Sequence, residues 1–282
     1  MHMTPKKLLS LFGLKWNPFQ PETPNEALVA LDETATFIWR IENLLSEGGI
    51  ALVTGEPGAG KSTALRLTED RLLAIPEVSL SKIERPQSRL TDFYAELSDG
   101  FNISINPRNR LGSFRQIREE WRSHITATLT RPTVLIDEAQ FLNEEVLDEL
   151  RMLLSDAFDK RRILVVILAG DNRLIERLKH PNLLPLASRI RVKLTFKPLP
   201  EDDMHRILAH AIAAAGNAKL MTVGVMETIV THSGGNPRTM MNMADELLAH
   251  AVSREKVQID EKLYLEIHQA QQRPKAKQAR LK

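Results

Sequence analysis

The chain alternates between short apolar runs and segments whose apolar residues recur at helical spacing. Apolar runs of strand length lie at 50–54, 133–136, 163–169 and 192–196, and 77–85 has the mixed pattern of a half-buried strand. Helical patterns fall before and between them, at 32–46, 61–74, 89–97, 113–129, 143–158 and 173–178. Strands that alternate with helices predict an α/β fold with a parallel sheet sandwiched by helices.

The pattern becomes all-helical after Pro198 and Pro200. Predicted helices cover 201–215, 223–231 and 237–253, and a short one covers 261–267. No acidic residue follows Glu266, and low hydrophobicity with like charges predicts a disordered tail that binds an anionic partner, with a solubilising tail as the alternative. We therefore expect four parts: an N-terminal arm at 1–13, an α/β core at 14–198, a helical lid at 199–265 and a basic disordered tail at 266–282.

The first strand runs into the pattern G-x-x-x-x-G-K-[ST], which is a phosphate-binding loop when a strand precedes it and a helix follows. Its backbone N–H groups would cradle nucleotide phosphates, and the helix beginning near Lys61 would add its positive dipole end. Lys61 would contact the β- and γ-phosphates, and the Ser62 hydroxyl would ligate Mg²⁺. The candidate nucleotide-binding residues are Gly55, Glu56, Pro57, Gly58, Ala59, Gly60, Lys61, Ser62 and Thr63.

Two further strand ends carry polar residues. The strand at 133–136 ends in Asp137 and Glu138; Asp137 would hold the hydration shell of Mg²⁺ and Glu138 would polarise the attacking water, although Asp137 could merely cap a helix. The strand at 163–169 is followed by Asp171 and Asn172. Either one could sense the γ-phosphate or the water, and Asp171 could equally cap the next helix. No Asn-Lys-x-Asp signature follows, which favours ATP over GTP.

Several basic residues are candidates for binding anions. Arg238 lies in the first turn of a predicted helix, where the dipole disfavours a cation, so contact with a nucleotide is favoured over a surface role. A further group could line a channel for nucleic-acid phosphate or form a solvated surface, and the sequence leaves both open. It comprises Lys82, Arg85, Arg89, Arg108, Arg110 and Arg115. Trp16 and Phe19 could wall an adenine pocket or pack in the core.

Composition narrows the function classes. The 282 residues carry a net charge of +2 and contain no cysteine, which excludes disulfides, thiol catalysis and cysteine-ligated metal sites. The eight histidines form no zinc or triad signature. No apolar run is long enough to cross a bilayer, and no signal peptide follows the N-terminal lysines, so we expect a cytoplasmic protein with no membrane partner.

These motifs together resemble the AAA+ ATPase module, a P-loop NTPase with a C-terminal helical lid. Residues 55–62 resemble Walker A, residues 134–138 resemble Walker B, and residues 170–172 resemble the end of the sensor-one strand. Arg189, in Ala-Ser-Arg-Ile, resembles the arginine finger that a neighbouring subunit inserts, and Arg238 resembles sensor two. The resemblance implies the cofactors ATP and Mg²⁺ and a homo-oligomer in the form of a ring or helical filament. Asp171 stands where a neutral polar sensor is more usual.

Within AAA+, the segments Phe12–Phe19, Leu168–Gly170 and Ser233–Arg238 resemble the ExeA-like ATPases, which border the transposon-encoded regulators of the MuB, TnsC, TniB and IstB kind. The chain shows no membrane segment, so this resemblance favours an ATP-dependent regulator of transposition. Such a protein assembles on duplex DNA, selects the target and recruits a transposase, with hydrolysis driving disassembly. The alternatives are an ExeA-like secretion or envelope-assembly ATPase and a replication initiator or helicase loader.

Overall fold

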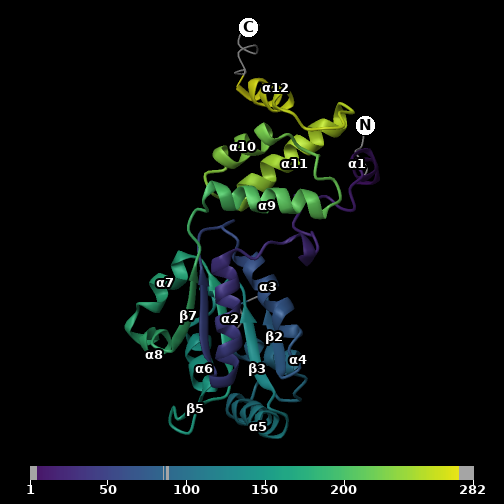
Figure 1. Cartoon of the computed structure of the whole chain (residues 1–282). Coiled ribbons are helices and arrows are strands. Elements are labelled where there is room, and N and C mark those ends of the chain that lie inside the picture. Colours follow the sequence, from purple (N-terminus) through teal and green to yellow (C-terminus); the bar gives the residue numbers. More distant parts are fainter. Residues whose placement is uncertain (1–4, 85, 87–88, 273–282) are drawn as a thin grey trace, which may run out of the picture. The chain divides into compact units, whose positions relative to one another are not determined.

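The computed structural model describes residues 5–84, 86 and 89–272 (Figure 1). The chain divides into two compact units. Of the described residues, those from 30 to 197 form an α/β unit, and those before 30 and after 197 form a helical unit. The α/β unit has two apolar cores and the helical unit has one of its own, so each unit is described by itself.

The α/β unit is built on a five-stranded parallel sheet, as the sequence predicted. Its strands are β1 (Gly49–Thr54), β2 (Val78–Ile83), β3 (Arg131–Ile136), β6 (Val165–Gly170) and β7 (Ile190–Thr195), in the order β2-β3-β6-β1-β7. Every residue of β1 and β6 is buried. Burial on both faces explains why these two strands are apolar at nearly every position instead of alternating.

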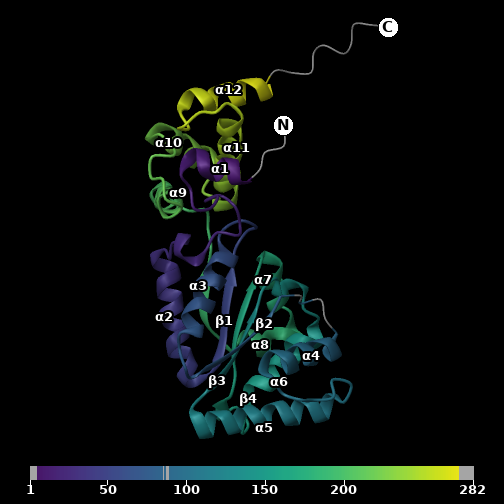
Figure 2. The same cartoon turned by 90° about the vertical axis from the view of Figure 1, so that its right-hand side faces the viewer.

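Helices cover both faces of the sheet (Figure 2). In this unit they are α2 (Asp32–Glu47), α3 (Lys61–Leu73), α4 (Leu90–Phe101), α5 (Arg110–Thr128), α6 (Glu144–Leu154), α7 (Asn172–Leu178) and α8 (Leu184–Ala187), with short 3₁₀ turns η2 (Ala139–Phe141) and η3 (Pro181–Leu183). Ala51 and Val53 of β1 pack with α2 and α3, whereas Ile50 and Leu52 pack in the core that α4 to α8 share. The alternation of side chains along β1 thus supplies both cores.

The predicted helix at 143–158 is wrong in its second half. The helix α6 ends at Leu154, and a small antiparallel hairpin follows, made of β4 (Ser155–Asp156) and β5 (Arg161–Arg162). The guanidinium of Arg118 donates to the carbonyl oxygens of Met152, at 2.6 Å, and Ser155. An arginine that occupies carbonyls at the end of a helix offers them partners in place of another turn, which accounts for the early end.

The helical unit contains α1 (Pro5–Phe12), the 3₁₀ turn η1 (Asn25–Ala27), α9 (Glu201–Ala214), α10 (Val223–His232), α11 (Pro237–Ser253) and α12 (Glu261–Gln272). The turn before α11 depends on Gly235, whose φ is +75° and where an added Cβ would lie 2.7 Å from the carbonyl oxygen of Leu199. None of the helices in the described ranges combines the length and the apolar character that a membrane crossing requires.

Two boundaries differ from those expected. Residues 14–29 group with the helical unit, not with the α/β core, because Leu14 and Phe19 are buried in the core that α9 to α12 form. Phe19 therefore has the packing role that was one of its two alternatives. At the other end, α12 runs to Gln272, past the expected start of the tail at 266, and residues 273–282 lie outside the described residues.

Candidate nucleotide-binding site

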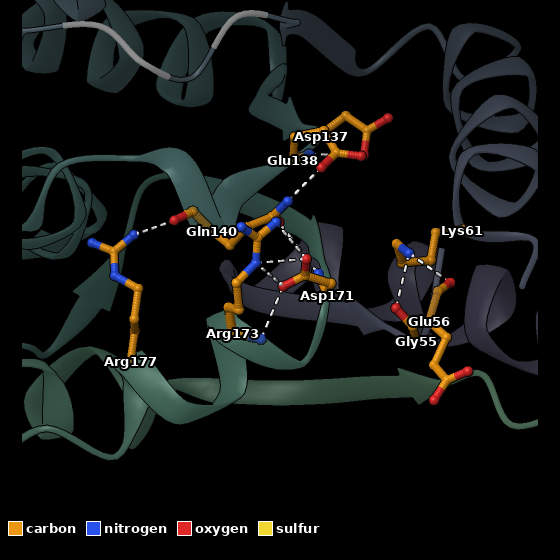
Figure 3. Close-up of polar contacts among 9 residues, drawn as sticks. All are labelled: Gly55, Glu56, Lys61, Asp137, Glu138, Gln140, Asp171, Arg173 and Arg177. Atoms are coloured by element: carbon orange, nitrogen blue, oxygen red, sulfur yellow. Dashed lines mark hydrogen bonds and ion pairs between the residues drawn. The ribbon is translucent and has the colours of Figure 1, made fainter. Parts of the chain in front are cut away.

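Three loops meet at the carboxyl edge of the sheet. Thr54 at the end of β1 pairs with Gly170 at the end of β6, and Ile136 at the end of β3 pairs with Leu168. Because β6 lies between β1 and β3, the residues after it lie between the glycine-rich loop and the Asp137–Glu138 pair (Figure 3). In open α/β sheets, ligands bind at this edge, where neighbouring connections diverge.

The glycine-rich loop, residues 55–60, joins β1 to α3 and has the backbone of an anion site. Gly58 and Gly60 have φ values of +84° and +110°, which only glycine adopts readily. Such left-handed positions turn successive N–H groups inward and form a concavity for anions. The helix α3 begins at Lys61 with Thr63 in its first turn, so its unpaired N–H groups face the same loop.

Lys61 lies inside this loop, with 7% of its surface exposed. Its ammonium donates to the carbonyl oxygens of Gly55, at 2.9 Å, and Glu56, at 3.0 Å (Figure 3). The next residue, Ser62, is exposed, and its hydroxyl donates to Oδ2 of Asp137 at 3.4 Å. The structure therefore brings together the ammonium, hydroxyl and carboxylate that the sequence assigns to phosphate and Mg²⁺.

Asp137 is partly buried, and its carboxylate is positioned to bind a cation. Burial raises its pKa, while a hydrogen bond from the N–H of Glu138 to Oδ1, at 2.8 Å, opposes the rise. No group of three or more histidine or acidic residues within the described ranges could hold a metal by itself. One hydroxyl and one carboxylate fit Mg²⁺, which is bound through one or two protein oxygens together with substrate phosphates.

Gln140 is a site residue that the sequence interpretation missed. It lies in η2, two residues after Glu138, and only 6% of its surface is exposed. Its Nε2 donates to Oε2 of Glu138, and its Oε1 accepts from the backbone N–H of Asp171 at 3.2 Å (Figure 3). The available signal was a polar side chain one residue beyond the acidic pair and immediately before the apolar Phe141 and Leu142.

Asp171 and Asn172 take different positions at the end of β6. Asp171 caps α7 by accepting from the N–H of Arg173 at 2.9 Å, and its carboxylate pairs with the Arg173 guanidinium at 2.6 Å. The hydrogen bond from Arg173 holds the pKa of Asp171 below its ordinary value. The capping alternative therefore describes Asp171, whose charge is paired. Asn172 is the first residue of α7 and is exposed.

The two arginines assigned to catalysis lie in different units. Arg189 precedes β7 in the α/β unit, where its guanidinium pairs with Asp159 in the β4–β5 turn and donates to the carbonyl oxygen of Pro185. Only 17% of the Arg189 side chain is exposed. Arg238 is the second residue of α11 in the helical unit, and its side chain is exposed.

The basic residues proposed for nucleic acid are dispersed. Lys82 pairs with Glu69 at 2.9 Å, and Arg110 pairs with the buried Glu149. Arg89 and Arg108 are exposed before α4 and α5, and Arg85 lies outside the described residues. Arg115 lines a cavity of about 570 Å³ between α5, α6 and the β4–β5 hairpin. Four further arginines line the same cavity: Arg118, Arg122, Arg151 and Arg189.

A parallel sheet flanked by helices, with a phosphate loop after β1 and an acidic pair after β3, is the P-loop NTPase fold. Within it, residues 43–178 match the family model described as AAA domain. The chain is also 29% identical, over 248 residues, to general secretion pathway protein A of Aeromonas hydrophila. That match covers 86% of this chain and 44% of the relative, so the chain spans less than half the relative's length.

Solved structures share this architecture at low sequence identity. Cdc6p from Pyrobaculum aerophilum aligns with a TM-score of 0.69 at 17% identity, covering 86% of this chain and 67% of the other. The Drosophila ORC bound to DNA gives 0.67 at 15%, covering 96% and 67%. The RuvB Holliday junction branch migration motor from Thermotoga maritima gives 0.61 at 15%, covering 90% and 73%. The expected fold class is thus confirmed as that of AAA+ structures.

Proposed function

We propose that the protein binds Mg·ATP in the glycine-rich loop and hydrolyses it. One observation carries this proposal: Lys61 lies within the loop while the Ser62 hydroxyl reaches the Asp137 carboxylate at 3.4 Å. Strands far apart in sequence place these three groups at one edge of the sheet. A set of one ammonium, one hydroxyl and one carboxylate accommodates a nucleotide phosphate, a divalent cation and the attacking water.

Each group has a defined role in the proposed reaction. Lys61 and the loop N–H groups hold the phosphates, and Ser62 with Asp137 would hold Mg²⁺. The ion supplies positive charge that offsets the charge developing on the phosphates. Glu138 orients the attacking water and accepts its proton. Asp171 and Asn172 lie at the end of β6, and of the two only Asn172 presents an uncharged side chain for γ-phosphate contact.

The proposed site is completed by a second copy of the chain. Arg189 of one subunit would reach the γ-phosphate held by its neighbour, and Arg238 would read the nucleotide within its own chain. A finger supplied in trans is worth ~10³ to 10⁵ in rate, so an isolated subunit should be nearly inactive. Assembly into a ring or filament is then coupled to the nucleotide state.

The biological process we favour is secretion or assembly of the cell envelope, with a protein as the client. The similarity to general secretion pathway protein A supports it. This reverses the order of preference from the motifs alone, which placed regulation of transposition first. Because the reaction consumes ATP, we propose that it takes place in the cytoplasm or at the cytoplasmic face of the membrane.

Duplex DNA is a second candidate partner, with a transposase downstream. The cavity beside α5 favours it, since five arginines line it and Arg115 is exposed with no ion pair among the described residues. Glu119 and Asp159 also line the cavity and reduce its positive charge. The ORC structure named above is bound to DNA, which supports DNA binding by a protein of this fold.

Binding of the full chain to random-sequence duplex DNA distinguishes the candidates. It should be measured with ATP, with ADP and without nucleotide, across a salt series. Binding that needs ATP and falls steeply with salt would establish the DNA candidate, because phosphate contacts release counterions. Arg115→Ala should then reduce the salt slope by about 1. If the protein hydrolyses ATP but binds no DNA in any nucleotide state, only the secretion candidate remains.

A further inference from the structure

We propose that Gln140 is a positioning residue that fixes the Glu138 carboxylate and ties it to the end of β6. This inference rests on the proposed hydrolysis, because it assigns Glu138 the role of orienting water. It goes further by identifying the group that holds Glu138 in place, and by predicting that the link from the γ-phosphate region to Glu138 runs through a single side-chain amide.

The backbone at Glu138 is fixed in an uncommon conformation. Its φ of +52° lies in the left-handed region, where a residue other than glycine is held only when its surroundings determine it. The Asp137 carboxylate accepts its N–H at 2.8 Å and provides that constraint. The starting direction of the Glu138 side chain is therefore set, and what remains variable is the orientation of its carboxylate.

Gln140 removes this remaining freedom. Its amide is buried and has one partner at each end: Nε2 donates to Oε2 of Glu138, and Oε1 accepts from the N–H of Asp171 at 3.2 Å (Figure 3). Only this orientation of the amide satisfies both contacts, because a flipped amide would set oxygen against carboxylate and N–H against N–H. With Oε2 held, Oε1 of Glu138 is the oxygen left for water.

Three further contacts support the amide. Arg177 donates to the carbonyl oxygen of Gln140 at 2.6 Å, which fixes its backbone. The guanidinium of Arg173 lies 4.9 Å from the ring centroid of Phe141, so α7 holds η2 at a second point. Gly170 leaves space for the amide, since an added Cβ would lie 2.7 Å from Oε1 of Gln140. A glycine at the end of β6 therefore lets the Gln140 side chain pack closely against the strand.

This arrangement connects two parts of the site that the sequence separates. Asp171 follows β6, the strand hydrogen-bonded to β1, and its carboxylate is occupied by Arg173. Its backbone N–H is what reaches Gln140. A shift of this segment when phosphate binds would pull on the amide and thereby on the Glu138 carboxylate, without any direct contact between Asp171 and Glu138.

The test is ATP hydrolysis by the full chain carrying Gln140→Leu, at a protein concentration where the wild type turns over. A misplaced catalytic group costs about 100-fold, so kcat should fall by about 100-fold while the ATP dissociation constant changes less than twofold. Gln116→Leu is the matched control. Its amide likewise donates one hydrogen bond, to the carbonyl oxygen of Ser104 at 2.7 Å, but lies on the exposed face of α5, so the kcat of this variant should equal that of the wild type.

A double-mutant cycle separates positioning from a general loss of structure. In a Glu138→Ala background, Gln140→Leu should cause no further loss, because its only effect runs through Glu138. A full additional loss there, or an equal fall in ATP affinity, would overturn the inference. Gly170→Ala tests it without changing Gln140 and should also lower kcat at unchanged ATP affinity, with the melting temperature recorded for each variant.

The outcomes also distinguish this inference from the proposed function. If Glu138→Ala hydrolyses ATP at the wild-type rate, the assignment of Glu138 fails and the proposed function must be revised. If Glu138→Ala loses most of its turnover but Gln140→Leu turns over normally, only the positioning role of Gln140 is refuted.

Discussion

The ion pair between Arg189 and Asp159 leads to a quantitative prediction about the rate of ATP hydrolysis. If Arg189 acts on the nucleotide of a neighbour, it must first leave Asp159 and the carbonyl oxygen of Pro185, both in its own chain. The hydrogen bond from Ser155 and the charge of Arg189 hold the pKa of Asp159 below its usual range, so this carboxylate is ionised at neutral pH. Asp159→Asn should therefore release the finger and raise hydrolysis.

The size of the effect follows from exposure. The Asp159 side chain is 48% exposed, and ion pairs in such positions contribute about 0.2–1 kcal/mol. Since 1.4 kcal/mol corresponds to a factor of ten, the variant should hydrolyse ATP about 1.4 to 5 times faster at a given protein concentration. Added salt should reduce this difference, because an exposed pair is screened.

The assay is ATP hydrolysis as a function of protein concentration. Ser155→Ala is the control, because the Ser155 hydroxyl also donates to Asp159 but does not touch Arg189. It should leave the rate near that of the wild type. Arg189→Ala should abolish turnover and spare nucleotide binding. A rate for Asp159→Asn at or below that of the wild type, in a variant that folds normally, would refute the reasoning, as would an equal increase in Ser155→Ala.

Three other predictions follow from the same structure. Asp137→Asn should bind ATP with little dependence on Mg²⁺, whereas removing Mg²⁺ with EDTA should weaken ATP binding by the wild type; calorimetric titration with and without EDTA checks both. Asp156→Asn should lower the free energy of unfolding by about 1.5–3 kcal/mol at pH 7, since it loses charged hydrogen bonds. The hydrogen bond from Arg122 lowers the pKa of Asp156 in the folded protein. The stabilisation that ionised Asp156 provides is therefore complete above the pKa of the unfolded chain, about 4, and is lost as the pH falls through the folded pKa. Urea melts of the wild type and of Asp156→Asn should converge in acid. Gly235→Ala should destabilise the helical unit by about 1–3 kcal/mol, through strained φ and contact with Leu199, and a thermal melt unchanged by this substitution would contradict the turn geometry.

The sequence predicted what depends on local pattern. Continuous apolar runs identified β1 and β6 because strands buried on both faces need no polar side chains. The glycine-rich loop was identified because few other sequences provide left-handed residues before a helix that begins with lysine. Both signals lie within a few consecutive residues, and neither depends on a distant partner.

Features that depend on distant partners were missed. The role of Gln140 arises from contacts with Asp171 and Arg177, more than thirty residues later. The early end of α6 arises from Arg118 on α5, since the segment itself remains compatible with a longer helix. The pairing of Arg189 with Asp159 is invisible for the same reason. Tertiary contacts determine these features, and the pattern of residues along the chain does not indicate which distant residues will be in contact.

Nucleotide binding and turnover by Lys61→Ala and Glu138→Gln test the account most directly. Lys61→Ala should lose ATP affinity because it removes the ammonium from the loop. Glu138→Gln should bind Mg·ATP as tightly as the wild type and fail to hydrolyse it, since the amide cannot accept the proton of water. Unchanged ATP binding by Lys61→Ala, or wild-type turnover by Glu138→Gln, would contradict the assignment of this edge of the sheet as an ATP-hydrolysing site.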